Sequence, residues 1–225
     1  MKRICAFSMS FFLLIIGTAL GQNQVYIIQY GSNNIISGAK LNSVGEITLA
    51  VYDPAKQTTI SGLNNLDISQ IGNNNKIGVF QNGFNDNIVH IQQVGINEAI
   101  IFDNAQYAGN NEANLIDIVQ NGLYNQSKIT RMSDGNTTIL NQLGDNNSFE
   151  STVYGNGNLS VVNQTGNNNL VSQQLQGDEM SYLFTQQGNG NQLIQIEKNT
   201  PVMQYEVYQR GNAMSITIIN GGILR

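Results

Sequence analysis

Residues 142–169 read QLGDNNSFESTVYGNGNLSVVNQTGNNN, and this stretch decides the fold. The pattern Gln-x-Gly-x-x-Asn begins at Gln142 and begins again at Gln164, which is 22 residues further along the chain. Midway between them lies a degenerate copy, Val153-Gly155-Asn158. Self-similarity at a fixed period indicates a stack of similar structural units.

The pattern extends in both directions from this stretch. The complete copies are Gln120-Gly122-Asn125, Gln142-Gly144-Asn147, Gln164-Gly166-Asn169 and Gln186-Gly188-Asn191. Degenerate copies alternate with them, namely Arg131-Ser133-Asn136, Val153-Gly155-Asn158 and Leu175-Gly177-Met180. Because alternate copies differ, the true repeat has 22 residues, and it predicts two strands and two turns in each unit.

Turns are expected at the glycines and asparagines, because glycine adopts positive φ freely and asparagine tolerates it. The predicted turn glycines are Gly122, Gly144, Gly155, Gly166, Gly177 and Gly188. Between turns the residues alternate as in strands, so that Asn147, Phe149, Ser151 and Val153 are expected to face inward. We therefore predict an all-β fold, an amyloid-like β-solenoid of about nine stacked two-strand coils with a 22-residue period.

The chain divides into three segments. Residues 1–21 have a basic start at Lys2 and Arg3, an apolar run and small residues at their end, which predicts a secretory signal peptide. Residues 22–62 form an irregular N-terminal repeat region, and residues 63–225 form the regular solenoid. Two stretches resist the pattern, residues 38–61 and residues 99–109.

The composition argues against several classes of function. Charged residues make up 11% of the chain, well below the ~25% of ordinary domains. The formal net charge is −5, and no basic cluster offers a surface for nucleic acid. The single cysteine, Cys5, lies in the signal segment, so stability must come from the repeat and not from disulfides.

Stacked coils would place equivalent residues ~4.8 Å apart along the axis. A side-chain amide both donates and accepts hydrogen bonds, so identical amides at that spacing can pair along a column. The sequence predicts such amide ladders at Gln120, Gln142, Gln164, Gln186, Asn125, Asn147, Asn169 and Asn191.

A few residues depart from the pattern. Arg131 and Glu197 fall in one inward column, three coils apart, so Arg131 is expected either to shift its strand locally or to reach water at a mouth of the coil. His90, the only histidine, is expected to point outward. Asp145, Asp178 and Glu179 are placed at turns without the rhythm of calcium-binding repeats. We expect no catalytic residues, no cofactor, no small-molecule substrate and no metal.

Several Gln-x-Gly-x-x-Asn units in strict register behind a signal peptide resemble the curlin repeat of bacterial curli fibre subunits. The resemblance covers most of residues 23–37 and 63–220. It implies an amyloid β-solenoid, a structural subunit of a fimbrium or pilus that polymerises outside the cell and serves in biofilm matrix and cell adhesion. The implied partners are further copies of itself, another curlin subunit and an outer-membrane curli export channel. The implied location is the cell surface of a bacterium with an outer membrane.

Three alternatives remain open from the residues alone. The chain could be the minor, nucleating subunit of such a fibre instead of the major one. It could be a monomeric ice- or polysaccharide-binding solenoid, although Thr130, Thr137, Thr152 and Thr185 do not form the flat threonine row that ice binders need. An enzyme on a β-helix would need charged residues clustered in a groove, whereas here the charges are scattered.

Overall fold

The computed structural model describes most of the chain from Gln24 to Gly221. The described residues are 24–30, 35–37, 40–41, 59–60, 65–82, 88–104, 114–131, 133–198 and 203–221. Within these ranges every regular element is a β-strand, and no helix there is long and apolar enough to cross a membrane.

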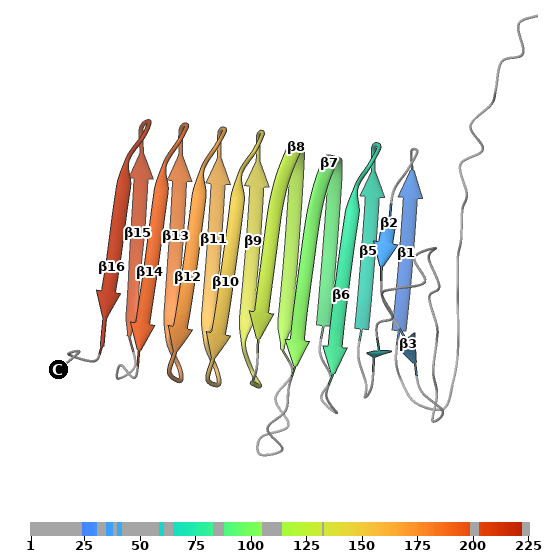
Figure 1. Cartoon of the computed structure of the whole chain (residues 1–225), viewed down its shortest axis with the longest axis horizontal. Helices are drawn as coiled ribbons and strands as arrows, with labels where there is room; N and C mark the ends of the chain where they lie inside the picture. The colour runs from blue at the N-terminus through green and yellow to red at the C-terminus, as the bar shows by residue number, and fades with distance from the viewer. Residues whose placement is uncertain are drawn as a thin grey trace, which may run out of the picture.

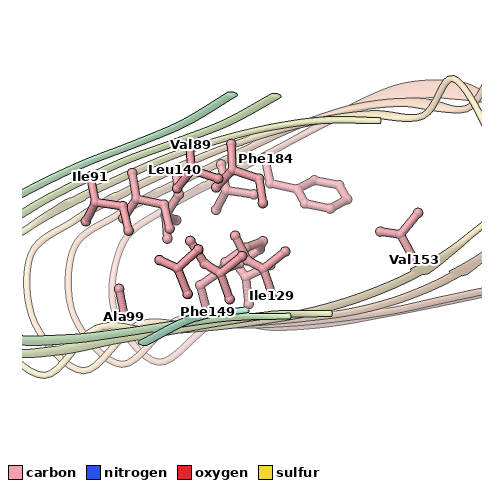
Figure 2. Close-up of a cluster of buried hydrophobic side chains, with 14 of the residues drawn as sticks. Val89, Ile91, Ala99, Ile129, Leu140, Phe149, Val153 and Phe184 are labelled. Atoms are coloured by element: carbon pink, nitrogen blue, oxygen red, sulfur yellow. The ribbon is translucent and has the colours of Figure 1, made fainter. Parts of the chain in front are cut away.

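The strands form two parallel stacks whose inner side chains face each other (Figures 1 and 2). The first stack contains, in order, β1 (Gln24–Tyr30), β5 (Asn65–Ile71), the first half of β7 (Ile88–Asn104), the first half of β8 (Leu115–Arg131), β9 (Thr137–Leu143), β11 (Leu159–Thr165), β13 (Ser181–Gln187) and β15 (Gln204–Arg210). The second contains β2 (Ile35–Ser37), β6 (Lys76–Asn82), the second halves of β7 and β8, β10 (Ser148–Tyr154), β12 (Leu170–Gln176), β14 (Gln192–Lys198) and β16 (Ser215–Asn220). A separate small pair joins β3 (Lys40–Leu41) and β4 (Thr59–Ile60).

The chain therefore winds as a β-solenoid, as the repeat predicts. Between β5 and β15 it makes about six turns with a period close to 22 residues. Leu115, Thr137, Leu159 and Ser181 stand directly over one another at intervals of 22 residues. The expected count of about nine coils is not confirmed.

One of the two stretches expected to resist the repeat joins the stack. Residues 98–104 form the second half of β7 and pair with both β6 and β8, so the expectation was wrong for this part of 99–109. The connection works because Gly95 turns the corner with φ of 112°, and β7 continues through it with one register shift between Ile96 and Glu98. The rest of that stretch, and all of 38–61 except β3 and β4, lies outside the described residues.

The core lies between the two stacks and is built from alternate residues of each strand (Figure 2). In β10 the buried residues are Phe149, Ser151 and Val153, while Ser148, Glu150 and Thr152 are partly or fully exposed. The predicted inward face is thus confirmed. Figure 2 shows Leu140 and Phe184 from the first stack pointing toward Ile129 and Phe149 from the second.

Glycine is required at one corner of each coil. Gly144 has φ of 113°, and a Cβ added there would lie 2.3 Å from the carbonyl oxygen of Gly166 in the next coil. Gly166 meets Gly188 in the same way, at 2.2 Å. The coils approach each other so closely at this corner that no side chain fits between them.

Candidate functional site

The most regular chemical feature of the molecule is a column of buried glutamines at the end of the first stack's strands. Strand register places Gln120, Gln142, Gln164 and Gln186 directly over one another. Each donates from Nε2 to Oε1 of the next glutamine, with distances of 2.8 to 2.9 Å. The column extends beyond these four to Gln70, Gln93 and Gln209, and every member is at most 1% exposed.

The same glutamines connect the two stacks. Nε2 of Gln142 also donates to the carbonyl oxygen of Gln126, the first residue of the facing strand segment, at 3.1 Å. Gln164 and Gln186 repeat this contact with Ser148 and Leu170. Both N–H groups of each amide are therefore used, one along the axis and one across the core. An amide buried without such partners would be destabilising by about 1–3 kcal/mol.

Buried asparagines form a second ladder at the corner between the stacks. It brings together Asn125, Asn147, Asn169 and Asn191 in one column. Oδ1 of Asn125 accepts hydrogen bonds from the backbone N–H and from Nδ2 of Asn147, at 3.0 and 3.1 Å. Nδ2 of Asn147 also donates to the carbonyl oxygen of Gly166 at 2.7 Å, which ties the asparagine to the glycine corner.

A third ladder lies at the opposite corner and is shorter. Oδ1 of Asn114 accepts from the backbone N–H of Asn136, and Oδ1 of Asn136 accepts from Asn158. Oδ1 of Asn158 then accepts from the backbone N–H of Met180, where the column of asparagines ends. Gly155 and Gly177 belong to this corner, and a Cβ on Gly155 would lie 2.0 Å from the carbonyl oxygen of Gly177.

The turn acids take part in similar backbone contacts on the outside. Oδ1 of Asp145 accepts the N–H of Leu123 at 2.8 Å, and Oδ1 of Asp178 accepts the N–H of Asn156 at 2.7 Å. Asn167 and Asn189 do the same for the coils that follow. Among the described residues, no group of three or more acidic, histidine or cysteine side chains is arranged to hold a metal ion.

Arg131 behaves differently from either expectation. It is 0% exposed, so it does not reach water, and its strand keeps its register with β10. Its Nη1 donates to the carbonyl oxygens of Leu115, at 3.2 Å, and Asn136, at 2.6 Å. The contact with Leu115 spans 16 residues, as does the contact between Gln142 and Gln126. The guanidinium thus makes the cross-core bond that glutamine makes in the other column, and register places Asp103 next to Arg131.

Glu197 lies in the same column as Arg131, three coils away, as expected. It is 0% exposed. Its Oε1 accepts hydrogen bonds from Gln195, Asn220 and the hydroxyl of Tyr205. Burial, followed by the contact with Glu197, raises the pKa of Tyr205 above its ordinary value, and burial with the same carboxylate raises that of Tyr182.

These contacts belong to a polar chain through the core that the sequence reasoning missed. Ser160 donates to Gln173, Gln173 to Gln195, Gln195 to Tyr205 and Tyr205 to Glu197. All four donors point toward the carboxylate. The 22-residue spacing of Gln173 and Gln195 was a signal for part of this chain. The hydrogen bond from Tyr205 could not be predicted from the repeat, because Tyr205 lies in β15 of the first stack and Glu197 lies in β14 of the second.

His90 points outward, as predicted, between the buried Val89 and Ile91. Its Nδ1 lies 2.8 Å from Oδ1 of Asp117 in the next coil, and its Nε2 lies 4.0 Å from Oδ2 of Asp67 in the previous one. The three side chains are about 40% exposed. When His90 is protonated, it therefore forms surface ion pairs with Asp67 and Asp117 that link three successive coils.

Comparison of the chain with protein-family models, with curated proteins and with solved structures finds no match.

Proposed function

We propose that the chain is a structural subunit that self-assembles end to end into extracellular, curli-like amyloid fibres. The observation that supports this most is the form of the two ends of the stack. Among the described strands, β15 pairs only with β13 and β16 only with β14, while β1 pairs only with β5 and β2 only with β6 (Figure 1). An edge strand offers unpaired backbone groups to another chain.

A second copy fits these edges because every coil repeats the geometry of the others. β1 places Val25, Ile27 and Gln29 opposite Leu66, Ile68 and Gln70. The coils at the two ends therefore place their inward side chains in the same columns of the stack. Addition of a copy extends both backbone ladders in the parallel, in-register arrangement that gives cross-β fibres their stability.

The biological setting of the proposal rests on the resemblance of the repeat to curlin. It includes secretion directed by residues 1–21, passage through an outer-membrane curli channel, and a role in biofilm matrix and cell adhesion. A second curlin subunit is the expected partner besides the chain itself. The proposed role is structural and involves no catalytic step, no cofactor and no small-molecule substrate.

The threonine pattern does not favour the ice-binding alternative. Thr130 and Thr152 are neighbours in one outward column, but Gln174 follows them. Thr137 and Thr185 lie in two other columns of the opposite stack.

The test is incubation of the mature chain, from residue 22 onward, at micromolar concentration. We expect a lag, then sedimentable fibres that bind thioflavin and diffract with a 4.7–4.8 Å meridional spacing. Growth accelerated by the chain's own seeds indicates a bulk subunit, whereas immediate growth that accelerates a second curlin indicates a nucleator. A chain that stays monomeric for weeks contradicts the proposal.

A further inference from the structure

The interior of the final coil differs from that of the coils between Ile68 and Leu193, whose inward apolar residues are buried. In the coil before it, Met180, which precedes β13, Tyr182 and Phe184 in β13, and Leu193 in β14 are at most 1% exposed. Their counterparts in the final coil, among them Met203, Tyr205, Val207 and Ile216, are only partly buried. This apolar edge, together with the open backbone of β15 and β16, is the surface onto which the proposed second copy would stack.

The asparagine ladders do not reach this surface. The longer one runs from Asn75 through Asn97 and Asn125 to Asn191, and Oδ1 of Asn191 accepts the backbone N–H of Met214 at 3.1 Å. Met214 occupies the asparagine position of the final coil and is 37% exposed. A thioether is a weak acceptor and no donor, so the side chain offers the N–H of a following coil a much poorer acceptor than the amide oxygen of an asparagine.

The glutamine ladder reaches the final coil but is closed there. Gln209 accepts from Gln186, and its Nε2 donates to the carbonyl oxygen of Gln192 at 3.0 Å. In the coils before it, the other N–H of this amide goes to the next glutamine. In Gln209 it goes instead to the carbonyl oxygen of Met214, at 3.2 Å. The last amide is therefore already satisfied within its own chain.

We infer that the joint between two copies is held by backbone edges and apolar side chains without the asparagine ladder, and that Met214 makes it the weakest junction of the fibre. This inference rests on the proposed end-to-end assembly and identifies the residue that sets its strength. Restoring an acceptor at position 214 should strengthen the joint by about one hydrogen bond, which corresponds to roughly a fivefold change in an equilibrium constant.

The test compares variants of the mature chain by the concentration of soluble protein that remains in equilibrium with fibres. Met214→Asn should lower this concentration about fivefold. Met214→Ser, which offers a shorter acceptor of the kind that Ser133 provides to the N–H of Gly155, should lower it by a smaller factor. Met214→Leu should leave it unchanged, because leucine fills the same space without an acceptor.

Ala213→Asn is the matched control. It adds an amide to the same turn, at a residue with φ of 54° where Asn146 and Asn168 stand in other coils, but on the exposed side. Hydrogen exchange of residues 115–198 in the monomer shows whether each variant keeps its stack.

The inference is overturned if folded Met214→Asn and Met214→Ser leave the soluble concentration at the wild-type value, or if Ala213→Asn lowers it as much as Met214→Asn does. In both cases wild-type fibres still form, so the proposed function stands. If neither the wild type nor any variant sediments, both the proposed function and this inference fail.

Discussion

Single residues in this molecule are constrained most where a side chain would enter the space between coils. Gly144 and Gly157 both have positive φ, 113° and 67°, yet their surroundings differ. A Cβ on Gly144 would meet the Gly166 carbonyl oxygen at 2.3 Å, whereas a Cβ on Gly157 would meet Cγ of Glu179 at 3.6 Å. The first position therefore excludes a side chain by contact as well as by conformation.

We predict that Gly144→Ala lowers the free energy of unfolding by about 3 kcal/mol or more, because backbone strain and the clash add. Gly157→Ala should lower it by only about 1 kcal/mol, from strain alone. Urea unfolding followed by circular dichroism measures both. Equal losses in the two variants would show that the approach of the coils is looser than the structure indicates.

The phenol of Tyr205 gives the molecule an alkaline limit. Its pKa is raised in the folded state, first by burial and then by Glu197, while in the unfolded chain a tyrosine ionises near pH 10. The stabilising contribution is therefore complete below about pH 10 and is lost as the pH rises from there toward the folded-state pKa.

We predict that the free energy of unfolding falls as the pH rises above about 10, and falls less steeply in Tyr205→Phe, which cannot ionise at this position. The variant starts from a lower stability because Glu197 loses a donor. Tyr208→Phe is the control, since Tyr208 is 60% exposed and bonds to Gln187 on the surface. Identical pH slopes for the wild type and Tyr205→Phe would contradict the assignment.

At the scale of the elements, each strand of the first stack from β5 to β15 is held to its neighbours by an interior glutamine as well as by its backbone. Gln164 in β11 accepts from Gln142 in β9 and donates to Gln186 in β13 and to Ser148 in β10. Loss of this one side chain therefore leaves polar groups on three other strands without their partner. Asn163, the residue before it, lies on the outer side and makes one exposed contact, with Asn141.

We predict that Gln164→Leu lowers the stability of β9, β10, β11 and β13 by about 2–4 kcal/mol, because buried donors and acceptors lose their partners. Asn163→Ala should change it by less than about 0.5 kcal/mol. Hydrogen exchange with mass spectrometry reports the two effects strand by strand. The ladder would be irrelevant to stability if both variants exchanged like the wild type.

At the scale of the whole molecule, the ion pairs on the surface contribute little to the stability of the stack. On the surface, Lys128 pairs with Glu150 at 2.9 Å, with both side chains about half exposed, and His90 contacts Asp67 and Asp117. Exposed pairs of this kind contribute between about 0 and 1 kcal/mol each and are screened by salt. The buried amide ladders carry no net charge.

We predict that raising sodium chloride from about 0.05 M to 1 M at pH 7 changes the free energy of unfolding by less than about 1 kcal/mol. Equilibrium urea unfolding at the two salt concentrations measures this. A large loss of stability in high salt would mean that ion pairs, and not amide ladders and apolar packing, hold the coils together.

Much of the fold could be predicted because the repeat is a local property. The spacing of Gln142, Gly144 and Asn147 from Gln164, Gly166 and Asn169 reveals the period, and alternation within each strand reveals which side faces inward. Identical residues at equal intervals can satisfy one another only when they are stacked. The sequence by itself therefore determined the solenoid, its phase and the inward columns.

The tertiary structure alone decided what the exceptional residues do. Arg131 takes the cross-core role of a glutamine, Glu197 draws donors from Tyr205 and Asn220, and Met214 ends a ladder that the repeat would continue. The partners of a residue that does not repeat come from other columns and other coils. Periodicity carries no information about such partners, because it relates each position only to its own equivalents.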